Sequence, residues 1–463
     1  MAIDYKEDIL FRIPIIGSIT KWLASEDSDF GALLFIFCVS LFAGMAYFTQ
    51  LSFGQIFIIT ALLAPIWLTY LVFRHLFFGM WIQYVGTKFN LNNGRSTLRI
   101  KLPPEVEKSP EAMEFVLNQM WNNYNSDNLM QTYIDGKKPL YFSLELVSIG
   151  GDVRFYMNVP TKKIKSLVEA ALYSQYPGVE VIEEPVDYIA EIPMGSKDWS
   201  LMSFHMAKKK DQEYPIKTYI DYGLDKMPKE EEKVDPLTPM LEVLGSISPN
   251  ERLYVQYILS APRDNTFKHG SLDAPQPSFE EKVRKKVNEM MNRDPATGKP
   301  VPSEGEEREE IARLTAGERN TIEAMERNAG KVAFKTGIRW MYVPRSDSFN
   351  ADNISKMIRS FSQFDMIGRN AVGIKWRTDA NYQTVFPWDA KKVAAWKKAE
   401  LKEYKKRVYY NKTQSDEPKF FSTEELATMY HLPGKVALTP NLGRIESTRS
   451  TAPANLPVGN LPT

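Results

Sequence analysis

The stretch LYFSLELVSIGGDVRFYMNV, residues 140–159, carries the strongest fold signal in this chain. It consists of two runs rich in aromatic, leucine and β-branched side chains, separated by the pair Gly150-Gly151. Runs of this composition favour β-strands, and a short glycine turn between two of them is typical of a β-hairpin. The sequence therefore predicts two antiparallel strands that pair directly.

The elements on either side of this hairpin predict a ferredoxin-like unit. We expect a strand at 96–102 and a helix at 109–124 before the hairpin, and a helix at 162–176 and a strand at 179–188 after it. The resulting order, β-α-β-β-α-β, is that of the split βαβ motif. This first unit spans residues 95–190.

The same order of elements recurs in residues 197–377. Strands are predicted at 199–206, 252–259, 332–343 and 371–376, with helices at 236–246 and 351–364. An insertion at 262–330 separates the two central strands, and its two charged helical segments flank a Pro/Gly-rich stretch. This insertion fits either a solvated helical arm or an arm that binds a partner. The predicted fold class is α+β, with two tandem ferredoxin-like units and a helical insertion in the second.

Two apolar runs near the N-terminus predict membrane-spanning helices. They occupy residues 31–48 and 56–78, and the uncharged connector TQLSFGQ joins them. A helix needs about 20 apolar residues to cross the hydrocarbon layer. The polar and mixed residues 1–29 before the first run argue against a cleaved signal peptide. We therefore expect a transmembrane helical hairpin over residues 30–85, with a buried pair of globular helices as the alternative.

Lysine and arginine residues near these runs predict the orientation of the hairpin. Arg12 and Lys21 precede it, five further basic residues follow between residues 74 and 101, and the connector has none. By the positive-inside rule, both residues 1–29 and the large part after the hairpin then lie on the cytoplasmic side.

The sequence gives no sign of catalysis, of a metal site or of a cofactor. The formal net charge is +1, and a single cysteine, Cys38, excludes a disulfide within one chain. The four histidines are far apart and lack the spacing of zinc ligands. The nearest match to a phosphate-binding loop, TGKP at 297–300, lacks the first glycine and the hydroxyl residue after the lysine. We therefore predict a protein that is not an enzyme and holds no cofactor or metal.

The last segment, residues 378–463, begins with a predicted basic helix and continues as an extended tail. The helix, KKVAAWKKAELKEYKKR at 391–407, combines many lysines with two aromatic side chains. Nucleic acid, anionic lipid head groups or an acidic partner would each suit it, and a solvated surface helix is the simplest interpretation. The candidate residues for binding an anionic surface are Lys391, Lys392, Lys397, Lys398, Lys405, Lys406 and Arg407.

The end of the chain resembles a known family. Residues 420–457 read FFSTEELATMYHLPGKVALTPNLGRIESTRSTAPANLP. They are similar to the segment before the motor domain in membrane-bound ATPases that resemble type IV secretion coupling proteins, found largely in bacteria with reduced genomes. Three more blocks, at 159–183, 235–259 and 338–350, are similar to the same family. The resemblance thus covers about residues 96–457.

This resemblance implies a non-catalytic, membrane-anchored accessory or scaffold subunit of a type IV secretion-like, DNA-translocating machine in the bacterial inner membrane. The given sequence lacks a phosphate loop, so we expect its ATPase motor to be a separate subunit. The candidate residues for docking that motor are Glu424, Glu425, His431, Pro433 and Arg444. The expected partners are the lipid bilayer, the ATPase, nucleic acid or anionic lipid at the basic helix, and further copies of the chain. The alternatives are a structural cell-envelope membrane protein without a transport role, and an enzyme whose site the sequence does not reveal.

Overall fold

The computed structural model describes most of the chain from residue 81 onward, and the statements below concern the described residues. Besides single positions between 40 and 80, the described ranges are 81–103, 108–121, 129–137, 140–196, 198–226, 234–262, 278–295, 297–298, 314–378, 387–409 and 418–434. The chain divides into two compact units, one made of Met1–Thr87, Leu129–Gly136 and Asp264–Gln276 and the other of the remaining residues.

The predicted membrane hairpin is contradicted. Among the described residues, no helix is long and apolar enough to cross a membrane. Helix α4 (Ile82–Asn93) has 12 residues and is about 18 Å long, whereas the hydrocarbon layer is about 30 Å thick. The finding also overturns the two-pass location in the inner membrane, and residues 1–80 lie outside the described part of the chain except for single positions.

The smaller unit contains the short helix α6 (Leu129–Tyr133). The indole Nε1 of Trp81 donates a hydrogen bond to the carbonyl of Tyr133 at 2.7 Å. Gly136 has a φ of +66°, and a Cβ there would lie 2.4 Å from the Val85 carbonyl group. Only glycine therefore fits at this close backbone approach.

The larger unit is built on one antiparallel sheet of nine described strands, which confirms the α+β class. The strands are β1 (Ser96–Lys101), β2 (Tyr141–Ile149), β3 (Asp152–Val159), β4 (Glu180–Glu183), β5 (Met202–Lys208), β6 (Glu251–Ser260), β7 (Ala333–Pro344), β8 (Val372–Arg377) and β9 (Lys419–Ser422). Their order across the sheet is β4-β1-β3-β2-β6-β7-β5-β8, and β9 pairs with β7.

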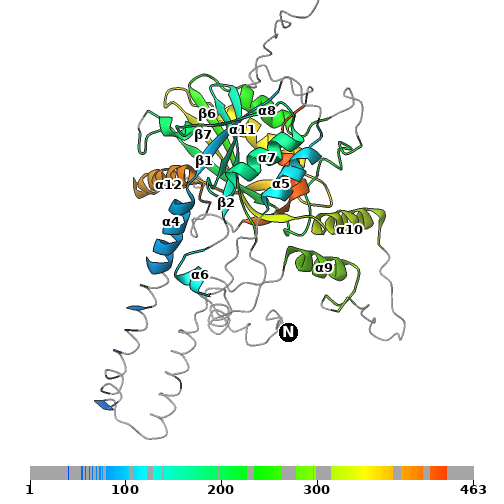
Figure 1. Ribbon diagram of the computed structural model, residues 1–463, viewed down its shortest axis with the longest axis horizontal. Coiled ribbons are helices and arrows are strands. Elements are labelled where there is room, and N and C mark those ends of the chain that lie inside the picture. The colour runs from blue at the N-terminus through cyan, green and yellow to red at the C-terminus, as the bar shows by residue number, and fades with distance from the viewer. Residues whose placement is uncertain are drawn as a thin grey trace, which may run out of the picture. The chain divides into compact units, whose positions relative to one another are not determined.

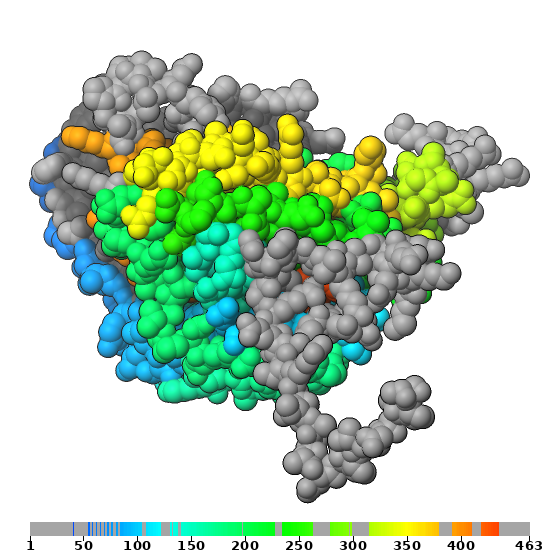
Figure 2. Space-filling view, turned by 90° about the horizontal axis from the view of Figure 1, so that it is seen from above, coloured from blue at the N-terminus to red at the C-terminus, as the bar shows by residue number. Residues whose placement is uncertain are grey.

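This sheet contains two sets of four strands with the same internal order. Strands β4-β1-β3-β2 form the first set and β8-β5-β7-β6 the second, each with the order of a βαββαβ sandwich. The two predicted units share this one sheet, because β6 pairs with β2 along all of β2, from Tyr141–Ser260 to Ile149–Arg252. Both strands are buried along most of their length, so neither is a solvated edge. Figure 2 shows the first half, in blue to blue-green, beside the second, in green to yellow.

Five helices pack on one face of the sheet (Figure 1). They are α5 (Glu111–Met120), α7 (Lys165–Gln175), α8 (Thr238–Gly245), α11 (Ala351–Ser360) and α13 (Thr423–Met429). Alternate strand residues such as Leu144, Val255 and Trp340 supply the apolar core beneath them, and all three are 0% exposed. Burial of this apolar area is the main source of stability.

Helix α13 joins the two halves. It begins with a capping box in which the Ser422 hydroxyl and the Glu425 carboxylate each accept a backbone N–H. The ring of Tyr430, just after it, lies 5.6 Å from Phe155 on β3 and 6.5 Å from Tyr257 on β6. Helix α13 is therefore part of the core.

The opposite face of the sheet is covered by α12 (Pro387–Lys406) and the 3-10 helix η3 (Tyr188–Glu191). Leu401 and Tyr404 of α12 pack on Tyr254, Met341 and neighbouring residues of the sheet. The central layer of strands is thus enclosed between helices on both sides.

The insertion in the second half contains α9 (Phe279–Met290) and α10 (Ala316–Ala329). Both helices begin with a capping box, at Ser278 and at Thr315. Their apolar faces meet in a small cluster that includes Phe420 of β9, whose ring stacks on Phe279 at 5.2 Å. The described helices of the arm therefore pack on their own chain.

Candidate functional site

A row of polar side chains crosses the sheet beneath α12. Glu145 of β2 pairs in register with Gln256 of β6, Gln256 with Arg339 of β7, and Arg339 with His205 of β5. All four residues are 0% exposed. Because these strands alternate between the two faces, the four side chains lie on the face that α12 covers.

At one end of this row, α12 supplies a carboxylate. Oε2 of Glu400 lies 2.8 Å from Nε2 of His205 and accepts a hydrogen bond from the Ser203 hydroxyl at 3.0 Å. It is also 3.6 Å from Nη1 of Arg339. Burial raises the pKa of Glu400, but His205 and Arg339 outweigh this effect, so the pKa lies below its ordinary value. Burial lowers the pKa of His205 more than Glu400 raises it, which favours a neutral imidazole.

At the other end, Arg407 reaches down from the end of α12. Its Nε donates to Oε1 of Glu145 at 3.1 Å and its Nη2 to Oδ1 of Asp187 at 3.0 Å. Glu145 also accepts from the Tyr188 hydroxyl at 2.7 Å and from Gln256 Nε2 at 2.8 Å. Burial raises the pKa of Glu145, but the charge of Arg407 and the hydrogen bonds from Arg407, Ser143 and Tyr188 together outweigh burial and hold the pKa at about 2.

The placement of Arg407 corrects one predicted anion-binding residue. Arg407 is 3% exposed and has a φ of +53°. The backbone leaves the helix in the left-handed region at this residue, and the guanidinium lies inside the sheet-facing layer. A partner on the protein surface cannot reach it in this fold.

Most of the other predicted residues of α12 face solvent. Lys391, Lys392, Lys398 and Lys406 are exposed, as is Lys402, which the prediction omitted. Lys397 and Lys405 are partly buried, and the Lys405 ammonium donates to the Ile192 carbonyl at 2.5 Å. A hollow of about 380 Å³ adjoins the helix, lined by Trp199, Lys397 and Lys398 among others.

The predicted docking residues of the C-terminal segment are mostly buried. Glu424 and Glu425 are 0% exposed. Glu424 pairs with Arg327 at 3.0 Å and with Lys331 at 3.1 Å, and Glu425 pairs with Lys208 at 2.8 Å. Both carboxylates are thus bound by the same chain.

His431 and Pro433 are buried as well. Nε2 of His431 lies 3.1 Å from Oδ1 of Asp235, and this contact outweighs burial and raises the pKa of the imidazole. Arg444 lies outside the described residues. The segment therefore acts inside the fold up to Gly434, and none of its described candidate residues presents a free charged surface.

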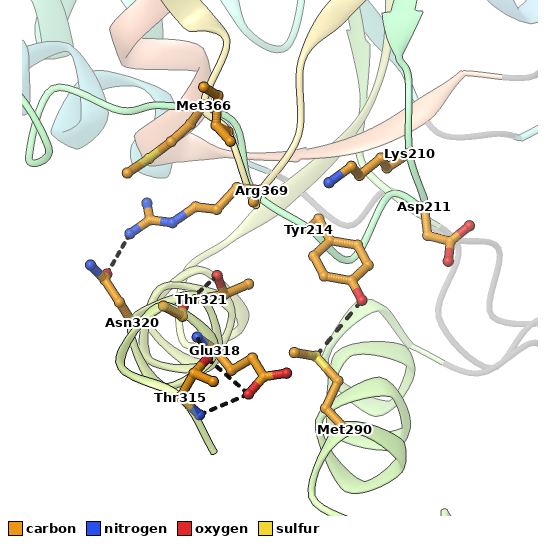
Figure 3. A pocket seen from close by; sticks show the side chains of 13 residues that line it. Lys210, Asp211, Tyr214, Met290, Thr315, Glu318, Asn320, Thr321, Met366 and Arg369 are labelled. Carbon is orange, nitrogen blue, oxygen red and sulfur yellow. Dashed lines mark hydrogen bonds between the residues drawn. The ribbon is translucent and has the colours of Figure 1, made fainter.

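A cavity of about 760 Å³ opens between the helical arm and the loops of the second half (Figure 3). Tyr214 and Met290 line one side, where the Tyr214 hydroxyl contacts the Met290 sulfur at 3.7 Å. Arg369 lines the other side, held by Asp221 at 2.9 Å and by Asn320 at 2.7 Å. Its size suits a small ligand, but Arg369 is engaged by side chains of its own chain.

The charged groups of the polar row and of α13 bind partners of their own chain. No group of three or more His, Cys, Asp or Glu residues in the described part of the chain is arranged to hold a metal ion. The polar row lies beneath α12, closed to a substrate. Gln256, which stands between apolar and aromatic residues in LYVQYIL (253–259), was the sequence signal for a polar layer at the centre of the sheet.

A family model described as Domain of unknown function (DUF8128) matches residues 88–444. The chain belongs to this family. The match extends from within α4 to beyond α13, so the polar row, α12 and the C-terminal segment up to residue 444 lie inside the DUF8128 domain. No curated protein matches the chain.

Proposed function

We propose that the DUF8128 domain is a non-catalytic platform that docks a separate ATPase in a type IV secretion-like, DNA-translocating machine. One observation carries the proposal. The stretch that resembles the segment before a motor domain contains α13, which is locked between the two halves of the sheet.

The ion pairs around α13 make this a firm attachment. Glu424 and Glu425 bind three basic side chains, from the arm, from the start of β7 and from β5. Removal of one partner of a buried pair is strongly destabilising. The residues that directly precede position 435 are therefore held in a fixed place, which suits a segment that positions a second protein.

The burial of the described polar groups supports a binding role over a catalytic one. Glu145, Glu400 and His205 are buried and bonded within the chain, beneath α12. Under this proposal residues 435–463, which include Arg444, contact the ATPase, while the buried residues before Gly434 hold that segment in place.

Co-expression with an ATPase encoded by a neighbouring reading frame tests the proposal. We expect the full chain to co-purify with the ATPase, and a chain that ends at Gly434 to fold but lose it. The matched control keeps residues 435–463 in shuffled order and should also lose the ATPase. Equal recovery by the truncated chain, or no recovery by the full chain, would refute docking.

A further inference from the structure

A row of exposed lysines follows the outer side of α12. Its members, called the lysine stripe below, are Lys391, Lys398, Lys402 and Lys406. They are separated by seven, four and four residues, and at 3.6 residues per turn these spacings place all four on one side of the helix. Glu400 and Tyr404, on the other side, are 0% exposed.

The charge of the stripe is not neutralised by acidic side chains in the described part of the chain. None of its four lysines takes part in an ion pair there, whereas an exposed lysine elsewhere does, Lys209 with Asp365 at 3.8 Å. The two acids of α12 with described side chains do not compensate. Glu400 is buried, and Glu403 is half-buried with its Oε2 atom out of solvent.

The helix that carries the stripe is held firmly on the sheet. Glu400 binds His205, the Tyr404 and Tyr188 hydroxyls lie 2.7 Å apart, and the Lys405 ammonium binds the Ile192 carbonyl. The four lysines are therefore presented in a fixed line. At 1.5 Å per residue this line is about 22 Å long.

The length and chemistry of the stripe match a strand of nucleic acid. A strand carries one phosphate per roughly 3.4 Å of helix axis, so about six phosphates run along a 22 Å line. Lysine ammonium groups bind phosphates as point charges and read no sequence. The hollow beside Lys397 and Lys398, with Trp199 in its wall, leaves room next to the stripe for sugar and base.

An anionic membrane surface fits α12 less well. Helices that lie on membranes insert large apolar side chains opposite their charged face. In α12 the corresponding residue Leu401 is buried against the sheet, and Trp396 packs on Trp376 at 6.2 Å. The exposed side carries lysines and alanines.

We propose that the lysine stripe binds the phosphate backbone of a nucleic acid without sequence preference. The inference deepens the proposed function, since a DNA-translocating machine must hold its cargo near the motor. It is tested without any ATPase, so that either proposal can fail while the other stands.

The experiment measures fluorescence anisotropy of a labelled 25-nucleotide strand and of the matching duplex, with the full chain, between 50 and 300 mM NaCl (roughly the range where salt slopes are measured). The test variant replaces Lys391, Lys398, Lys402 and Lys406 by Gln. The matched control replaces four exposed basic residues of α9 and α11 by Gln, namely Arg284, Lys285, Lys356 and Arg359.

We expect the full chain and the control to bind, and the stripe variant to lose about tenfold or more in affinity at low salt. Its slope of log affinity against log salt should fall by about 4, close to one for each lysine that contacts a phosphate. Comparison of strand and duplex shows which form is preferred. Equal loss in the control, absence of binding by the full chain, or tighter binding to polyglutamate or to anionic vesicles would overturn the proposal.

Discussion

Beneath α12, a row of polar side chains replaces part of the apolar packing that usually holds a helix on a sheet. It runs from His205 through Glu400, Arg339 and Gln256 to Glu145. Buried ion pairs rarely add stability over apolar packing, but they make it costly to lose one partner. Several atoms here, including Nε of Arg339 and Oε1 of Glu400, have no hydrogen-bond partner among the described residues. These polar side chains therefore specify the position of α12 on the sheet more than they add to the stability of the fold.

Replacement of Arg407 by Gln should destabilise the fold. The change leaves the buried Glu145 carboxylate without its main counter-charge, at a cost of about 3–5 kcal/mol. Lys406→Gln, one residue earlier and exposed, is the control and should stay within about 0.5 kcal/mol. Urea unfolding of both variants measures the difference, and a similar effect in both would contradict the buried ion pair.

The pH dependence of stability should reveal Glu403. Burial, and then the charge of Glu400, raise its pKa from 4.5 to about 7. The folded state thus retains a proton that the unfolded state releases, so this contribution to stability is present below pH 4.5 and is lost as the pH rises through 7. Glu403→Gln should therefore raise the melting temperature at pH 8 and leave it nearly unchanged at pH 4.5. An equal shift at both pH values would be inconsistent with the raised pKa.

The local sequence explains why the burial of individual charged residues was not predicted. Arg407 ends a run of basic residues and looks like its surface neighbours, because only the left-handed φ of +53° turns its side chain inward. In the sequence, Glu424 and Glu425 look like two exposed acidic residues in the first turn of a surface helix. Their partners Arg327, Lys331 and Lys208 are about 90 to 220 residues away, and no local pattern shows such contacts.

At the scale of elements, the sequence predicted the strands well and their association poorly. The hairpin β2–β3 and the two βαββαβ orders follow from local alternation and glycine turns. The pairing of β2 with β6 does not, because each strand has one apolar and one mixed face and fits either a free or a paired edge. The capping box of α13 is formed by Ser422 and Glu425, three residues apart, and is a local feature, whereas the burial of α13 depends on contacts with β3 and β6.

Two glycines offer a matched test of element packing. A Cβ on Gly337 in β7 would lie 2.3 Å from the Tyr409 ring, whereas one on Gly317 in α10 would meet nothing within 4 Å. Gly337→Ala should destabilise by about 1–3 kcal/mol through overpacking. Gly317→Ala should stabilise by about 0.5–1 kcal/mol through helix propensity. Chemical denaturation measures both, and a stabilising Gly337→Ala would contradict the packing of Tyr409 on β7.

At the scale of the whole molecule, the larger unit is organised around the junction of its two halves. The β2–β6 pair joins the strands, α13 joins the cores on one face, and Arg407 at the end of α12 is bound by β2. These three contacts make one body of two similar sets of elements. The described part of the chain ends at Gly434, and we propose that residues 435–463 contact the ATPase.

Hydrogen–deuterium exchange of the full chain, with and without the ATPase, tests this account most directly. On addition of the ATPase, we expect exchange to slow within residues 435–463. Exchange in α13 should stay unchanged, because its backbone is already protected in the core. Slower exchange confined to residues before Gly434, or no change anywhere in the chain, would contradict a docking platform whose contact segment begins after α13.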